Sequence, residues 1–145
     1  MKIKTLLAAS LLFVTPVLQA GEIPSGAQLQ QIAEQKTQKI DTPALVKMLD
    51  SELDMVLVDI RNADEIRNMG GAIKATQNIN IPRGWLEFRI QRIAISKDTP
   101  IVVYCGAGFR SPFAAETLQK MGYTHVKNYS EGYLGWKKAG LPIAQ

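Results

Sequence analysis

Residues 100–112 read PIVVYCGAGFRSP and hold the only cysteine in the sequence, Cys105. The short β-branched apolar run before the cysteine is typical of a buried strand. The two glycines after it allow a tight turn. Ser111 followed by Pro112 is typical of the first turn of a helix, with the serine as its N-cap. The stretch therefore predicts a strand, a tight loop and a helix in direct succession.

The same alternation of strand and helix runs through most of the chain. Short apolar strands are predicted at residues 39–40, 55–60, 78–81, 100–104 and 125–128. Helices are predicted to follow them at residues 42–49, 62–68, 85–89, 112–121 and 132–140. This regular order predicts an α/β domain with a mainly parallel five-stranded sheet flanked by helices.

Local signals mark where several of these helices begin and end. Thr42 and Pro43 are expected to be the N-cap and the first helical residue of one helix. Asn62 and Glu65, three residues apart, have the spacing of a capping box. Gly122 is expected to end the helix that follows the cysteine loop.

The first twenty residues have the pattern of a secretory signal peptide. Lys2 and Lys4 precede a nine-residue apolar run at 6–14, and Ala20 is a small residue at the expected cleavage point. The apolar run is shorter than the about 20 residues that cross a bilayer. We therefore expect export to a bacterial periplasm and no membrane partner after cleavage.

The chain thus divides into three regions. Residues 1–20 are the expected signal peptide, and residues 21–37 are a polar, Gln-rich extension with some helix near Leu29 and Ile32. Residues 38–145 are the expected domain, and the 125 residues at 21–145 that remain after cleavage suit one domain with a single core.

Charge and composition exclude several classes of partner. Removing residues 1–20, which hold two lysines and no acid, would lower the formal net charge from +4 to +2. The basic residues are scattered among acids, so we expect no nucleic-acid partner. One cysteine and one histidine, His125, cannot supply a redox cysteine pair or a zinc cluster. We therefore expect no metal and no organic cofactor.

Cys105 could be a reactive nucleophile or a small buried residue at the end of a strand. Ligands of parallel α/β sheets bind at the carboxyl ends of the strands, where this cysteine is expected. Gly106, Gly108 and the helix start would turn backbone N–H groups inward and form a nest for an anion. Such a nest, together with a cation such as Arg110, would stabilise a thiolate. The flanking residues therefore favour a nucleophile.

Four ordered blocks of the sequence resemble the rhodanese sulfurtransferases. YCGAGFRS at 104–111 is similar to the family's active-site loop, C-x-x-G-x-R-S, and LVDIRNADEI at 57–66 resembles its first signature. INIP at 79–82 and GYTHVKNYSEGYLGWKKAGLPI at 122–143 resemble its later blocks. The resemblance covers about residues 38–145 and implies a single-domain rhodanese-like fold.

The resemblance implies sulfur transfer through a persulfide on Cys105. A small anionic donor such as thiosulfate would supply the sulfur, and a thiophilic acceptor such as cyanide or a thiol, including a protein thiol, would remove it. The persulfide would be held by backbone N–H groups of five loop residues. These residues are Gly106, Ala107, Gly108, Phe109 and Arg110.

The resemblance leaves the donor open. Members active with thiosulfate often carry a basic residue directly after the cysteine, where this chain has Gly106. The Cys-Gly-x-Gly order is closer to mercaptopyruvate sulfurtransferases, which usually have threonine where this chain has Arg110.

Two other functions are alternatives to sulfur transfer. Tyrosine phosphatases place five residues between cysteine and arginine to surround a phosphate, whereas four separate Cys105 from Arg110. A non-enzymatic persulfide carrier or interaction domain is the second alternative.

Several further residues have two interpretations. Asp59 and Arg61 could orient the cysteine loop or form a structural ion pair, and Ser111 is expected to be a helix cap rather than a substrate ligand. The aromatic residues Trp85, Phe88 and Trp136 are expected in the core or the pocket wall. The basic residues Arg83 and Arg89 are expected to be solvated surface charges.

Overall fold

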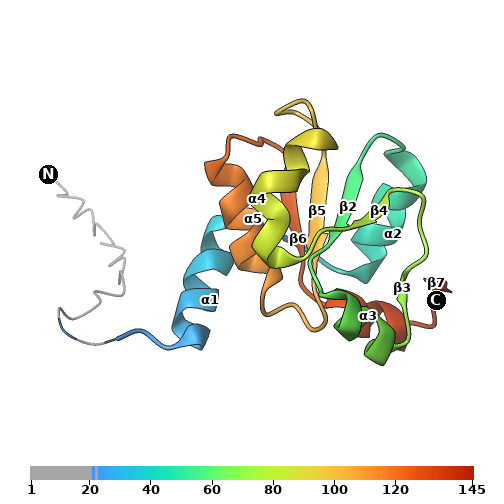
Figure 1. Ribbon diagram of the computed structural model, residues 1–145, viewed down its shortest axis with the longest axis horizontal. Helices are drawn as coiled ribbons and strands as arrows, with labels where there is room; N and C mark the ends of the chain where they lie inside the picture. The colour runs from blue at the N-terminus through green and yellow to red at the C-terminus, as the bar shows by residue number, and fades with distance from the viewer. Residues whose placement is uncertain (1–20, 22) are drawn as a thin grey trace, which may run out of the picture.

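Five parallel strands form the central sheet in the order β1-β6-β5-β2-β4 (Figure 1). The computed structural model describes residue 21 and residues 23–145, so the signal peptide expected at 1–20 lies outside the described residues and stays a prediction. The strands are β1 (Gln38–Ile40), β2 (Val56–Asp59), β4 (Asn78–Asn80), β5 (Ile101–Tyr104) and β6 (Val126–Tyr129). The predicted α/β fold with a parallel five-stranded sheet is confirmed.

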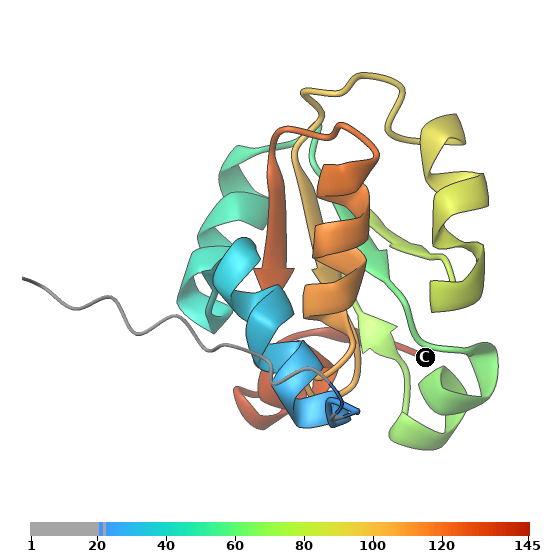
Figure 2. The same cartoon turned by 90° about the vertical axis from the view of Figure 1, so that its left-hand side faces the viewer.

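Helices cover both faces of this sheet, as Figure 2 shows. On one side lie the 3₁₀ turn η1 (Arg83–Trp85), α4 (Leu86–Arg89), the turn η2 (Ile90–Arg92) and α5 (Ser111–Lys120). On the other side lie α2 (Thr42–Ser51) and α6 (Gly132–Lys138), and α3 (Ala63–Met69) follows the carboxyl end of β2.

The central strands β2 and β5 are buried on both faces, and their residues alternate between two halves of the core. Val58 and Val103 face the core half under α4 and α5, whereas Leu57 and Val102 face the half under α2 and α6. All four side chains are fully buried. This explains why β2 and β5 are continuous apolar runs rather than alternating ones.

The N-terminal extension forms helix α1 (Gly26–Lys36), which packs against α5. A capping box between Ser25 and Gln28 begins the helix, and Ala33 is buried. The Lys36 Nζ atom lies 3.1 Å from Glu116 Oε1 on α5. The extension is thereby attached to the domain.

A second, two-stranded sheet was not predicted. In it β3 (Ala72–Ile73) pairs antiparallel with β7 (Ile143–Ala144). Gly71 precedes β3 with φ +119°, and a Cβ on it would lie 2.1 Å from the carbonyl oxygen of Ala144. A glycine is therefore needed where the end of the chain crosses this segment.

The structure shifts two helix boundaries by one residue. Asp41, not Thr42, is the N-cap of α2, because its carboxylate accepts the backbone N–H of Ala44 at 2.9 Å. The helix after the cysteine begins at Ser111 itself, with Arg110 in the N-cap position. The capping box of Asn62 and the stop at Gly122, with φ +101°, are confirmed.

Two aromatic residues expected in the core or pocket wall lie instead at the surface. Trp85 and Phe88 are 53% and 74% exposed, while Trp136 is buried as expected. The core positions of their segment are taken by Leu86, Ile90 and Ala94. Within the described part of the chain, no helix has both the length and the apolar character needed to cross a bilayer.

Candidate active site

Cys105 follows β5 directly and its thiol is recessed. The residue is 1% exposed and packs in the core half that includes Ile60 and Ile81. The backbone N–H of Arg110 donates to Sγ at 3.4 Å, and the thiol lies 3.8 Å from the Ser111 hydroxyl. The sulfur therefore lies at the carboxyl edge of the sheet and is covered by the loop of residues 106–110.

Contacts with the segment after β6 hold the cysteine loop in a tightly turned conformation. The Cys105 and Gly106 carbonyls accept the N–H groups of Tyr133 and Leu134, at 2.8 and 2.9 Å. Gly108 has φ +82°, and a Cβ there would lie 1.9 Å from the Ser130 carbonyl oxygen. The carbonyls of the loop are thus turned toward α6, and a side chain at position 108 is excluded.

The remaining N–H groups of the loop are free. Among the described residues, the N–H groups of Gly106, Ala107, Gly108 and Phe109 have no hydrogen-bond partner. The five-donor nest predicted from the sequence therefore has one donor, Arg110, bonded to the thiol. Four more remain available to an added anion.

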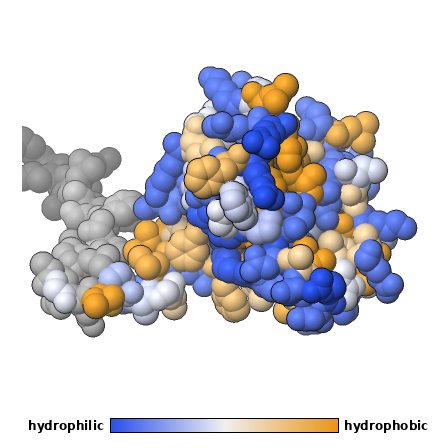
Figure 3. All heavy atoms as spheres, viewed as in Figure 1, coloured by the Kyte–Doolittle hydropathy of each residue, from blue (hydrophilic) through white to orange (hydrophobic). Residues whose placement is uncertain are grey.

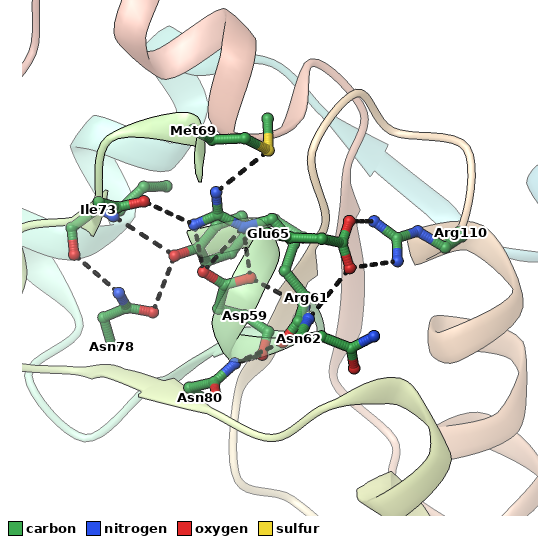
Figure 4. A network of polar contacts seen from close by, with 11 residues as sticks. Asp59, Arg61, Asn62, Glu65, Met69, Ile73, Asn78, Asn80 and Arg110 are labelled. Atoms are coloured by element: carbon green, nitrogen blue, oxygen red, sulfur yellow. Dashed lines mark hydrogen bonds and ion pairs between the residues drawn. The ribbon is translucent and has the colours of Figure 1, made fainter. Parts of the chain in front are cut away.

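The Arg110 side chain forms an ion pair with Glu65 of α3 (Figure 4). Its two Nη atoms donate to the two carboxylate oxygens at 3.0 and 2.5 Å. Hydrogen bonds to Arg110 hold the pKa of Glu65 below its usual value, and the same contact raises the pKa of Arg110. Sequence reasoning assigned Glu65 only to the capping box and missed this role.

Glu65 also accepts the backbone N–H of Asn62 at 3.1 Å, so one carboxylate begins α3 and holds the cysteine loop. Because its pKa is lower in the folded chain, ionised Glu65 stabilises the fold above its unfolded pKa. That contribution is lost as the pH falls through the folded pKa.

We expect Glu65→Gln to lower the free energy of unfolding by about 0.2–1 kcal/mol at pH 7, the range for partly exposed pairs. The difference from the wild type should shrink as the pH falls through the lowered pKa of folded Glu65, because the carboxyl is then protonated in both states. Urea unfolding between pH 3 and 7 measures it, with the exposed Asp54→Asn as control. A difference that did not depend on pH would contradict the assigned ion pair.

Asp59 and Arg61 form a fully buried ion pair beside this site (Figure 4). Arg61 Nε and Nη2 bind the carboxylate of Asp59, and Nη2 also donates to the Gly71 carbonyl at 3.0 Å. Burial lowers the pKa of Arg61, but the bonds and attraction to Asp59 outweigh it and the net pKa is raised. The hydrogen bonds of the Arg61 side chain thus join β2 to the segment before β3, and the ion pair supports the fold.

This buried pair also reaches the cysteine loop through one intermediate. The Arg61 guanidinium lies 4.1 Å from the centre of the Tyr133 ring, and the Tyr133 backbone N–H holds the Cys105 carbonyl. The ion pair therefore contacts the loop through Tyr133 rather than directly, and its role in orienting the loop stays a prediction.

Ser111 does not act as the helix cap that the sequence indicated. It is the first residue of α5, and its side chain makes no capping hydrogen bond. The buried hydroxyl lies between the thiol of Cys105 and the carbonyl of Gly108, which is 3.5 Å away. It is therefore the neighbouring polar side chain that faces the sulfur.

Met69 was also missed by the sequence reasoning. Its Sδ accepts from Arg61 Nη1 at 3.6 Å, and its methyl group would lie 3.2 Å from a Cβ on Gly106. This methionine therefore covers the residue directly after the cysteine, and it leaves little room for a basic side chain at position 106.

A parallel α/β sheet with a lone thiol in an N–H nest at its carboxyl edge defines a class of cysteine-dependent domains. Within that class, residues 41–139 match the rhodanese-like domain family, and the chain belongs to this family. The family assignment made from the sequence is confirmed.

The chain is similar to a sulfurtransferase from Allochromatium vinosum. The two are 35% identical over 105 residues, which cover 72% of this chain and 92% of the relative. Relatives of this kind support rhodanese-type sulfur transfer as the family's chemistry.

Two solved structures show the same fold. The polysulfide-sulfur transferase homodimer of Wolinella succinogenes superposes with a TM-score of 0.72 and 26% identity, over 80% of this chain and 84% of the other. A Rhodopseudomonas palustris protein of unknown function, described as a possible tyrosine phosphatase, has a TM-score of 0.74 and 29% identity. It covers 88% of this chain and 99% of its own.

Proposed function

We propose that this protein is a sulfurtransferase that carries a sulfane sulfur as a persulfide on Cys105. The observation that supports this most is the buried thiol that accepts the Arg110 N–H, in a loop whose other four N–H groups have no partner among the described residues. A nest of this size suits one added sulfur atom, which needs hydrogen-bond donors but no large cavity.

The reaction has two half-steps. The Cys105 thiolate attacks the outer sulfur of thiosulfate, a sulfur–sulfur bond forms on the enzyme, and the donor's sulfur–sulfur bond breaks to release sulfite. Cyanide or a thiol then attacks the outer sulfur of the persulfide, which releases thiocyanate or a new persulfide and restores the Cys105 thiolate.

The protein's own groups assist each half-step without a metal or organic cofactor. The loop N–H groups stabilise the thiolate and the negative persulfide, and the Ser111 hydroxyl, which accepts a hydrogen bond from the thiol, can turn to donate one to the thiolate. Glu65 neutralises Arg110 at the rim of the loop, so the site attracts anions through oriented backbone dipoles more than through a free side-chain cation.

The donor is proposed to be a small sulfur anion, with thiosulfate as the one to use in vitro. Gly106 supplies no side-chain cation after the cysteine, and Met69 covers this position. The similar Wolinella protein is named for polysulfide, which is a further small sulfur anion to compare.

A phosphatase is disfavoured by the same geometry. With four residues between cysteine and arginine, the Arg110 N–H already lies 3.4 Å from the thiol, and the guanidinium is occupied by Glu65. A phosphate needs room for three oxygens and a free arginine. Measurable hydrolysis of an aryl phosphate by the wild type would reverse this ranking.

We further propose that residues 1–20 direct export to a bacterial periplasm, because a basic start precedes a short apolar run and Ala20. A periplasmic form that begins at Gly21 would support this.

The decisive experiment weighs the intact protein after incubation with a donor. We expect thiosulfate to add one sulfur atom to the wild type, and cyanide to remove it again. Mercaptopyruvate and polysulfide, tested separately, rank the donors. Absence of an adduct with all three would contradict the proposed function.

A further inference from the structure

The segment from η1 to η2 presents an unusual face to solvent. Leu86 and Ile90 of this segment, and Ala94 just after it, are buried in the core. Four side chains at the spacing of one helical face lie on the other side. These are Trp85, Phe88, Arg89 and Arg92, which we call the aromatic-arginine stripe.

The stripe is exposed but ordered by its own contacts. The rings of Trp85 and Phe88 meet edge to face with centroids 6.2 Å apart, and the Arg89 guanidinium lies 4.7 Å from the Trp85 ring. Figure 3 shows apolar side chains beside strongly hydrophilic ones over the position of α4. Tryptophan and arginine are the residues most enriched at the energetic centres of protein interfaces.

The segment is basic. Residues 83–92 hold three arginines and one acid, Glu87. Arg83 is paired with Glu87 at 2.9 Å, whereas Arg89 and Arg92 form no ion pair with any described residue. The stripe therefore offers two uncompensated positive charges next to two exposed aromatic rings.

The segment that carries the stripe starts at the carboxyl edge of the sheet, where the cysteine loop also lies. Arg83, the first residue of the segment, follows the carboxyl end of β4, and its N–H donates to the Ile60 carbonyl at 3.0 Å. The Arg83 side chain reaches Thr117 of α5 at 2.9 Å, and Leu86 shares a core cluster with Cys105. Phe109 of the cysteine loop is itself 64% exposed at this edge.

We propose that the aromatic-arginine stripe docks a partner protein through an acidic segment that carries the thiol exchanging sulfur with Cys105. This inference rests on the proposed function and adds the chemistry of the partner. Two uncompensated arginines select an acidic segment, and the exposed rings bind its apolar side chains.

The burial of the thiol explains why a docking surface would help sulfur transfer to a protein acceptor. Because Cys105 is 1% exposed, an acceptor thiol must enter at one edge and in one orientation. Docking beside the loop makes that approach intramolecular, which raises the effective concentration of the acceptor. A patch of four side chains suits a transient contact that releases the loaded partner.

The test uses two synthetic twelve-residue peptides with one cysteine each, identical except that glutamates in one are lysines in the other. Each accepts sulfur from the persulfide of the full mature chain, and kcat/KM is measured. We expect the wild type to favour the acidic peptide about tenfold. In Arg89→Glu/Arg92→Glu the preference should reverse, while turnover with cyanide stays unchanged.

Binding is measured separately by fluorescence in the Cys105→Ser protein. Trp85 is half exposed and Trp136 is buried, so a docked acidic peptide should shift the emission to shorter wavelength. Trp85→Phe should remove most of the shift. The matched control is Lys74→Glu/Lys97→Glu, which changes the net charge equally at exposed lysines outside the stripe and should keep the wild-type preference.

The outcomes separate the two proposals. If no persulfide forms and cyanide is not turned over, the proposed function fails and the sulfur-exchanging partner with it. If cyanide turnover is normal but the charge exchange leaves the peptide preference unchanged, the docking surface alone is overturned. Dimers of the wild type that Trp85→Ala dissociates would likewise overturn it, in favour of a second copy of this chain.

Discussion

Cys105→Ser should lower sulfur transfer from thiosulfate to cyanide by at least about 10³-fold. A serine hydroxyl cannot form the persulfide, and Cys105 is the only cysteine of the chain. Steady-state thiocyanate production measures the loss, and mass measurement should show no sulfur adduct on the variant.

Serine is close to cysteine in size, so the buried site should stay folded, and Cys105→Ala provides a second variant. Circular dichroism and the urea midpoint test the fold of both. Ser111→Ala provides a comparison for adduct formation: it removes the neighbouring hydroxyl but keeps the nucleophile, so it should still gain one sulfur atom from thiosulfate. If either cysteine variant kept turnover while folded, the covalent route would be wrong. A pure interaction domain would keep its binding in these variants and have no turnover even as wild type.

Arg61→Met should lower the free energy of unfolding by about 3–5 kcal/mol, the cost of breaking a buried ion pair from one side. The variant leaves the Asp59 carboxylate fully buried, with the Arg61 backbone N–H at 3.1 Å as its remaining close donor. A domain of this size has a total stability of about 5–15 kcal/mol, so the change is large. Urea unfolding at pH 7 measures it.

The exposed ion pair of Arg67 and Asp64 provides the matched control, since their side chains are 74% and 79% exposed. Arg67→Met should change the stability by less than about 0.5 kcal/mol. The double variant Asp59→Leu/Arg61→Met should recover part of the loss, because no unpaired charge remains. Equal losses in Arg61→Met and Arg67→Met would show that the buried pair is not the support described.

The sheet and the cysteine loop could be predicted because their signals are local. β-branched runs such as residues 101–104 mark strands buried on both faces, and the glycines and Ser-Pro pair mark the loop and the next helix. The order of these elements is enough to place Cys105 at the carboxyl edge of the sheet.

The partner of Arg110 could not be predicted in the same way. The ion pair joins residues 45 positions apart, and the capping box already explained why Glu65 stands where it does. Nothing in the sequence alone indicates that the Glu65 carboxylate also binds Arg110. The pairing of β3 with β7 was missed for a similar reason, because each strand is only two residues long.

The surface position of Trp85 and Phe88 contradicts a general expectation about large aromatic side chains. Hydrophobicity alone favours their burial. In this segment Leu86, Ile90 and Ala94 already occupy the side that faces the core, so the helical spacing turns the two rings outward. Burial of these three residues therefore leaves the two rings on the solvent side of a segment that starts at the same edge of the sheet as the cysteine loop.

The contacts between the cysteine loop and the first turn of α6 define what could be moved to another protein. The carbonyls of residues 105 and 106 are fixed by N–H groups from residues 133 and 134, and Gly108 fits against Ser130. The conformation of the hexapeptide from Cys105 to Arg110 therefore depends on a second segment, residues 130–134, as well as on its own sequence. A loop grafted alone onto another sheet would lose these contacts and with them its conformation. The smallest segment pair that could be transferred therefore includes the residues after β5 and those after β6.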